Sequence, residues 1–227
     1  MQTILQDFGL LAGFWMTIKL TFWSAIFSLV IGTFVAVMRL SPVGMLRQVG
    51  TAYVTLLRNT PLTLIILFCS IGIYGQLGIV LAGRDAPGGF IDTNNFRLAI
   101  LGLSVYHAAF VCEAIRSGVN TIPIGQAEAA RSIGLTFGQS LREIILPQAF
   151  RGAITPLGNT LIALTKNTTI AAAIGVAETA LVMKNVAEFD PGLLWTAFGL
   201  IAAGFVLLTV PMGLLTSHFA HKLAVRR

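Results

Sequence analysis

Charged residues are scarce in this sequence. Only 11% of the 227 residues are Asp, Glu, Lys or Arg, against about 25% in a typical soluble domain. Hydrophobic residues make up 56% of the chain, and the mean hydropathy is +0.84. This composition excludes an ordinary soluble protein and predicts an integral membrane protein.

Cysteine and reactive clusters are scarce as well. The only two cysteines, Cys69 and Cys112, both fall in apolar runs, so no disulfide framework is expected. The three histidines do not combine with cysteines or carboxylates at metal-ligand spacing. A Gly-x-x-x-x-Gly-Lys-Ser/Thr phosphate loop and a Ser/His/Asp or Cys/His arrangement are also absent. We therefore expect a chain that is not itself an enzyme, with no metal and no cofactor.

Long apolar runs predict the fold class. A helix needs about 20 apolar residues to cross a hydrocarbon core of about 30 Å, and these runs lack the alternation of a barrel strand. We predict an all-α integral membrane protein of about five transmembrane helices, in one domain over residues 1–227. The runs are Leu10–Met38, Leu62–Leu81, Leu98–Ile115, Ile154–Val182 and Leu193–Leu215. The first and fourth are long enough that we expect tilt, a break or an interfacial extension.

Small residues occupy one face of the first run. Ser24, Ser28, Gly32 and Ala36 follow one another at a spacing of four. Small side chains at this spacing allow a second helix to approach closely. We expect a packing seam there.

Basic residues predict the orientation. Cytoplasmic segments of membrane proteins carry an excess of Lys and Arg, and an N-terminus outside with a C-terminus in the cytoplasm gives nine basic residues inside against three outside. The nine are Arg39, Arg47, Arg116, Arg131, Arg142, Arg151, Lys222, Arg226 and Arg227, and the three are Arg84, Arg97 and Lys184. The net charge of +6 follows from this rule and suits contact with anionic membrane lipid, so no nucleic-acid partner is expected.

Two links between the runs are long. The external link Ala82–Phe96 is rich in Gly, Pro, Asp and Asn, which favour turns. The cytoplasmic link covers residues 117–152. There, Pro123 precedes a helix-forming run, Gly134 interrupts it, Thr136 is placed to cap a second helix, and Pro147 disturbs that helix. We predict two short helices with a bend at Gly134, whose apolar side chains face the membrane domain. Those side chains are Ala127, Ala130, Ile133, Leu141, Ile144 and Ile145.

The same link carries a recognisable pattern, "EAARSIGLTFGQSLREIILP". Glu128, Ala129 and Ala130, then Gly134, then Ile144 with Leu146 and Pro147, resemble the EAA loop of permease subunits in ATP-binding-cassette importers. The resemblance extends over nearly the whole chain, and it is greatest to the polar amino acid permeases, in particular the glutamate-uptake permeases of actinobacteria. The further matching segments are "LLRNTPLTLIILF", Leu56–Phe68; "AAFVCEAIRSGVNTIPIGQAEAARSIG", Ala108–Gly134; and "LTKNTTIAAAIGV", Leu164–Val176.

This resemblance implies a type I importer permease fold in a bacterial cell membrane. It implies two permease chains, identical or sister, two ATPase subunits that hydrolyse ATP, an extracellular substrate-binding protein, and an amino acid substrate, with glutamate leading. It also implies that the first short helix docks onto the ATPase. The residues matched to that coupling role are Glu128, Ala129, Ala130, Arg131 and Gly134. The alternative is an amphipathic helix lying on the bilayer, but only one of its two charges is basic.

Polar residues inside spans are costly and mark candidate path positions. These are Thr60, Lys166, Asn167, Thr168 and Thr169. We expect the last four to break the fourth span and to offer free backbone N–H groups that suit a carboxylate. Many relatives have Asp at the position of Asn167. Its absence beside Lys166 favours an anionic or neutral amino acid. Lys166 could instead pair with Glu113 or Glu178, or extend toward the interface.

One departure from the family pattern limits this transfer. Relatives often have Gln a few residues after the Thr-Pro of the second span, where this chain has Leu64, Ile65 and Ile66. The substrate contacts that the resemblance implies are therefore not assigned to Leu64, Ile65 or Ile66.

Three further charged residues fit structural or gating roles. Glu113 and Arg116 are three residues apart on one helix face and can pair. Arg58 is expected to anchor the cytoplasmic edge of the second span, and Thr60 with Pro61 to bend the chain near the path. Lys19 is expected to extend toward the outer interface.

Two other classes of function fit the sequence less well. A secondary transporter should show inverted halves, and five spans with a single cytoplasmic loop helix do not divide that way. A membrane-embedded enzyme needs a reactive cluster at one depth, and the sequence contains no such cluster.

Overall fold

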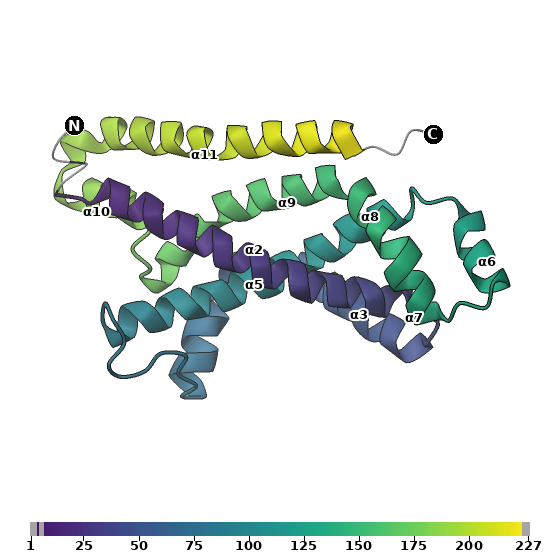
Figure 1. Ribbon diagram of the computed structural model, residues 1–227. Helices are drawn as coiled ribbons and strands as arrows, with labels where there is room; N and C mark the ends of the chain where they lie inside the picture. Colours follow the sequence, from purple (N-terminus) through teal and green to yellow (C-terminus); the bar gives the residue numbers. More distant parts are fainter. Residues whose placement is uncertain (1–3, 5–6, 224–227) are drawn as a thin grey trace.

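The computed structural model describes residue 4 and residues 7–223. Arg226 and Arg227, counted above among the cytoplasmic basic residues, lie outside the described residues. All regular elements in the described part are helices (Figure 1). Three of them are single, long and apolar enough to cross a membrane, and two bent helix pairs bring the number of spans to five if each pair is one span.

Helices α2 (Leu10–Leu40) and α5 (Phe90–Val119) form the centre of the molecule. They cross in Figure 1, and their buried apolar side chains form much of the core. At the crossing a Cβ on Gly32 would lie 2.6 Å from Cβ of Val111 and 2.7 Å from the carbonyl oxygen of Ala108. Ser24, Ser28 and Ala36 are buried, so the predicted seam of small residues is confirmed.

The second span is a helix pair with a sharp bend. Helix α3 (Gly44–Arg58) is followed by α4 (Leu62–Leu67), which continues into the π-helical η1 (Phe68–Gln76). The chain bends by 102° between α3 and the segment formed by α4 and η1. The predicted bend at Thr60 and Pro61 is therefore confirmed, because these residues lie within the break. Helix α3 was not predicted. It is amphipathic, with Val54 buried and the side chain of Arg47 exposed, and a search for long apolar runs overlooks such a helix.

Helix α5 begins eight residues before the predicted run, at Phe90. The prediction of turn structure up to Phe96 is wrong there, because the polar side chains of this first part have specific partners. The Asn94 Oδ1 atom accepts a hydrogen bond from the Leu81 amide at 2.8 Å, and Asn95 donates to the carbonyl of Ile174 at 2.8 Å. These bonds hold two side chains that the composition alone assigns to a loop, although Nδ2 of Asn94 is buried without a hydrogen-bond partner among the described residues.

The fourth span is broken, but later than predicted. Helix α9 (Ile154–Asn167) runs directly into the 3₁₀ helix η3 (Thr168–Ile174), and the Thr168 amide still bonds the Leu164 carbonyl. The break lies between η3 and α10 (Thr179–Phe189), where the span bends by 51°. The prediction of a break at 166–169 is thus wrong, since helical hydrogen bonding continues through these residues. The short η4 (Pro191–Leu193) leads into α11 (Leu194–Leu223), which packs along α9.

The long link at 117–152 forms an elbow. Helix α6 (Ile124–Ser132) ends at a bend where Gly134 has φ +84°, and α7 (Phe137–Ser140), the π-helical η2 (Leu141–Ile145) and α8 (Leu146–Gly152) follow without a break. The predicted bend and cap are confirmed: the Gln139 amide donates to Thr136 Oγ1 at 3.3 Å, in a capping box. In Figure 1 α6 lies at the end of the molecule where α11 finishes, opposite the end where α2 begins.

Two expectations for the elbow need correction. The second helix is not short, because the π-helical turn of η2 lets the chain pass Pro147 without the clash that proline causes in a regular α-helix. Ile133 does not face the membrane domain but is 76% exposed, while Ala130 and Leu141 are buried as expected.

Candidate functional site

A cavity of about 360 Å³ lies between α5 and α9. Asn159, Ala163 and Asn167 recur at a spacing of four on α9, and Tyr106 with Phe110 at the same spacing on α5, so each helix presents one face to the cavity. The lining is Tyr106, His107, Phe110, Asn159, Thr160, Ala163 and Asn167. This lining includes no carboxylate and no lysine or arginine. Of these residues only Asn167 was singled out from the sequence, and the four-residue spacing on both helices was the available signal for the others.

Asn167 is held in the cavity by His107. The amide nitrogen Nδ2 of Asn167 lies 3.3 Å from Nε2 of His107. Because an amide nitrogen can only donate, this contact places the imidazole proton on Nδ1. The Nδ1 atom is buried and has no hydrogen-bond partner among the described residues. His107 thereby fixes the direction of the Asn167 amide, whose oxygen is left to accept from another group.

The other predicted path residues are not gathered around this cavity. The hydroxyls of Thr60, Thr168 and Thr169 each donate to a backbone carbonyl three or four residues earlier in the chain, at 2.8 Å in all three cases. Lys166 is exposed and forms no ion pair with a carboxylate of the described residues. Pairing of Lys166 with Glu113 or Glu178 is therefore wrong, since both carboxylates have other partners.

The backbone N–H groups at the break are occupied by Glu178. This fully buried side chain accepts from the Ala180 amide at 2.9 Å, from the Leu181 amide at 3.2 Å and from the Thr179 hydroxyl at 3.0 Å. These are the groups that a broken helix would otherwise present to an anion. The expectation of free N–H groups for a substrate carboxylate is wrong here, because a carboxylate of the chain itself already binds them.

Replacing Glu178 by alanine tests this cap. We expect Glu178→Ala to destabilise the protein by about 1–2 kcal/mol, the usual cost of losing an N-terminal cap. The measurement is thermal unfolding of the purified protein in detergent. Glu188→Ala, which removes an exposed carboxylate from the other end of the same helix, is the control, and equal stability of the two variants would contradict the role of the cap.

Glu113 is the centre of an ion-pair cluster where α2, α3 and α5 meet. It contacts Arg39, and its carboxylate lies 3.7 Å from the Arg58 guanidinium and 3.4 Å from that of Arg116. The predicted pair of Glu113 with Arg116 is confirmed. Arg58 contacts Glu113 as well. The contact of Arg39 with Glu113 was not predicted, because the two residues are 74 positions apart in sequence.

This cluster adjoins the cavity. The guanidinium carbon of Arg58 lies 5.7 Å from the centre of the Phe110 ring, and Phe110 lines the cavity. Three guanidinium groups against one carboxylate leave two positive charges in excess. Positive potential is therefore concentrated at one end of the cavity.

The residues matched to coupling lie on the outer part of the elbow. Glu128, Ala129 and Arg131 are exposed on α6, and Ala130 is buried against the neighbouring helix. Two large apolar side chains near the ends of α6 are also exposed, Ile124 at 78% and Ile133 at 76%. Both side chains are thus accessible to another protein.

Comparisons with known proteins agree with this architecture. Residues 28–225 match the family described as binding-protein-dependent transport system inner membrane component. A glutamate transport system permease protein of Corynebacterium efficiens is 56% identical over 100% of both chains, and one of Corynebacterium glutamicum is 54% identical over the same shares. The structure resembles a chain of an amino acid ABC transporter crystallised with histidines, with a TM-score of 0.78 and 28% identity over 94% of this chain and 93% of that chain.

The family match covers most of the chain. It includes the elbow at 117–152 and nearly all of the membrane-spanning helices. The type I permease fold and the multi-pass membrane location predicted above are confirmed. This protein belongs to the inner membrane components of binding-protein-dependent transport systems.

Proposed function

We propose that the chain is the permease subunit of an ATP-driven importer of an anionic amino acid, and that this amino acid is glutamate. Its full-length similarity to glutamate permeases supports the substrate. The observation that carries the substrate class is the charge of the cavity: its lining holds no carboxylate, and the excess positive charge of the Glu113 cluster lies at one end. An anionic side chain meets no repulsion in such a path.

The proposed path uses Asn167 and the groups near it. Asn167, oriented by His107, offers hydrogen bonds to the substrate, and the exposed ammonium of Lys166 lies beside it in sequence. Thr168 and Thr169 then act as backbone spacers, and Thr60 acts through the bend that it shares with Pro61. Arg58, Glu113 and Arg116 form the gate at the inner end. A second permease chain, identical or sister, closes the open side of the path.

In this proposal residues 1–227 form one permease domain with its N-terminus outside, and residues 117–152 are its coupling loop. Glu128, Ala129, Ala130 and Arg131 dock onto an ATPase subunit, with Ile124 and Ile133 adding apolar contact area. ATP hydrolysis belongs to that partner, and an extracellular binding protein delivers the substrate at the opposite end. The exposure of both isoleucines on a protruding elbow supports this assignment.

The function is tested in vesicles that contain the whole importer. We expect uptake of labelled glutamate that requires ATP, the ATPase and the binding protein, and that excess unlabelled glutamate suppresses more strongly than excess glutamine or arginine. Uptake that continues after removal of the ATPase would favour a secondary transporter. Stronger competition by arginine than by glutamate would contradict the proposal that the substrate is anionic.

Replacing Asn167 by aspartate tests the charge of the cavity. A carboxylate here repels an anionic substrate, because two like charges separated by about 5 Å interact unfavourably by several kcal/mol at partial burial. We expect the KM for glutamate to rise by about tenfold or more. The measurement is glutamate uptake as a function of concentration in the same vesicles.

The matched control is Asn185→Asp, which makes the same chemical change on α10, outside the cavity and outside the coupling loop. We expect its KM to stay close to that of the unmodified importer. An unchanged KM in the Asn167→Asp importer would remove this residue from the substrate path, without bearing on the coupling loop.

A further inference from the structure

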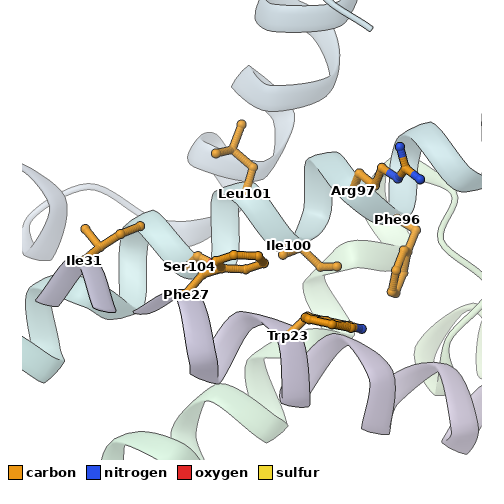
Figure 2. Close-up of a pocket in the computed structure, with 8 residues that line it drawn as sticks. All are labelled: Trp23, Phe27, Ile31, Phe96, Arg97, Ile100, Leu101 and Ser104. Atoms are coloured by element: carbon orange, nitrogen blue, oxygen red, sulfur yellow. The ribbon is translucent and has the colours of Figure 1, made fainter. Parts of the chain in front are cut away.

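A second cavity, of about 560 Å³, lies between α2 and α5 and opens on the outside of the chain. Figure 2 shows its wall, in which Trp23, Phe27 and Ile31 of α2 face Phe96 and Ile100 of α5. Trp23 and Phe27 are 44% and 45% exposed. Because both helices are membrane spans, this groove is open to the hydrocarbon region.

Two cations lie at one end of this groove. Arg97 is part of its lining and immediately precedes the apolar run that starts at Leu98, so it marks the boundary of that run. The Lys19 ammonium lies 5.7 Å from the centre of the Phe96 ring, at the same end. Arg97 donates to the Leu81 carbonyl, which uses one of five N–H groups. Neither cation forms an ion pair within the described part of the chain.

The charges restrict what can occupy the groove. An occupant must be apolar along most of its length and negative at the end that meets Lys19 and Arg97. An anionic phospholipid meets both requirements, because its acyl chains are apolar and its phosphate carries a negative charge.

We propose that this groove binds an anionic phospholipid. Its phosphate lies between Lys19 and Arg97, and one acyl chain lies along Trp23, Phe27, Ile31 and Ile100. The groove end with the cations is the end of the molecule at which α2 and α5 both begin, so the site belongs to the outer leaflet in the orientation proposed above. Long basic side chains near the boundary of a span reach the level of lipid phosphates.

Lipid binding to the intact importer tests the headgroup site. The importer is delipidated and titrated with phosphatidylglycerol or with phosphatidylcholine of the same acyl chains, and bound lipid is counted by native mass spectrometry. We expect tighter binding of phosphatidylglycerol. The Lys19→Gln/Arg97→Gln importer should lose about fivefold of that affinity for each cation removed, with binding of phosphatidylcholine unchanged. Lys184→Gln removes an exposed cation outside the groove and should change neither.

The acyl-chain part is tested on the same helix. Trp23→Ala should weaken binding of both lipids, while Trp15→Ala, which removes a 60% exposed tryptophan that is not part of the groove, should weaken neither. Equal binding of the two lipids by the unmodified importer would overturn the proposal. So would equal losses in Lys184→Gln and in the double variant, or disulfide crosslinking of Trp23→Cys to a neighbouring permease chain, which would mean that protein covers the groove.

Discussion

Gly134→Pro is expected to abolish uptake while leaving the chain inserted in the membrane. Gly134 has φ +84°, whereas proline fixes φ near −65°, so the bend after α6 cannot form. The Gly134 amide also donates to the Arg131 carbonyl at 3.0 Å, and proline has no N–H to replace that bond. We expect uptake to fall by more than tenfold, with ATP hydrolysis no longer dependent on the loaded binding protein. Uptake and hydrolysis are measured side by side in vesicles.

The control for this variant is Gly134→Asn. Asparagine adopts positive φ more readily than other residues with a side chain, and no atom outside the neighbouring residues lies within 4 Å of a Cβ built at this position. We therefore expect the Asn variant to retain most of its uptake. Normal uptake by the Gly134→Pro importer would contradict the coupling role of the elbow, whatever the behaviour of the Asn variant.

Glu113→Ala is expected to destabilise the protein and to impair transport. It removes the one carboxylate that three arginines share, and the Arg39 side chain is only 12% exposed. Loss of one partner of a fully buried pair costs about 3–5 kcal/mol. Because the Glu113 side chain is 31% exposed, water offsets part of this cost, and we expect about 2 kcal/mol. Thermal unfolding of the purified protein measures the loss.

The control here is Glu143→Ala, which breaks the pair of Glu143 with Arg142. That pair is 3.5 Å long and its side chains are 66% and 87% exposed, so its removal should cost less than about 1 kcal/mol. If the Glu113 and Glu143 variants unfold at the same temperature, the Glu113 cluster does not hold α2, α3 and α5 together.

The long apolar spans could be predicted from the sequence because each is read from its own residues. Residues 10–40 and 194–223 are apolar over more than one membrane thickness, and both form single helices. The elbow was also predictable, since Gly134 and Thr136 act through local backbone geometry and a cap within three residues. Such features depend on few neighbours.

The polar interactions within the membrane domain could not be read in the same way. Glu178 caps the helix that follows it, whereas the sequence predicted a break at residues 166–169 with free N–H groups for a substrate. Asn94 and Asn95 belong to a helix because of bonds to Leu81 and Ile174, the latter 79 positions away. His107 and Asn167 form a contact although they are 60 positions apart in sequence. Hydrogen-bond partners so distant in sequence are determined only by how the helices pack together.

The contact at Gly32 has a consequence for how the molecule can move. A Cβ on Gly32 would meet the Val111 side chain and the Ala108 carbonyl, so the distance between α2 and α5 leaves no room for a larger residue. We therefore expect these two helices to move together during transport. The changes of shape are then expected at the bends of 102° and 51° in the other two spans.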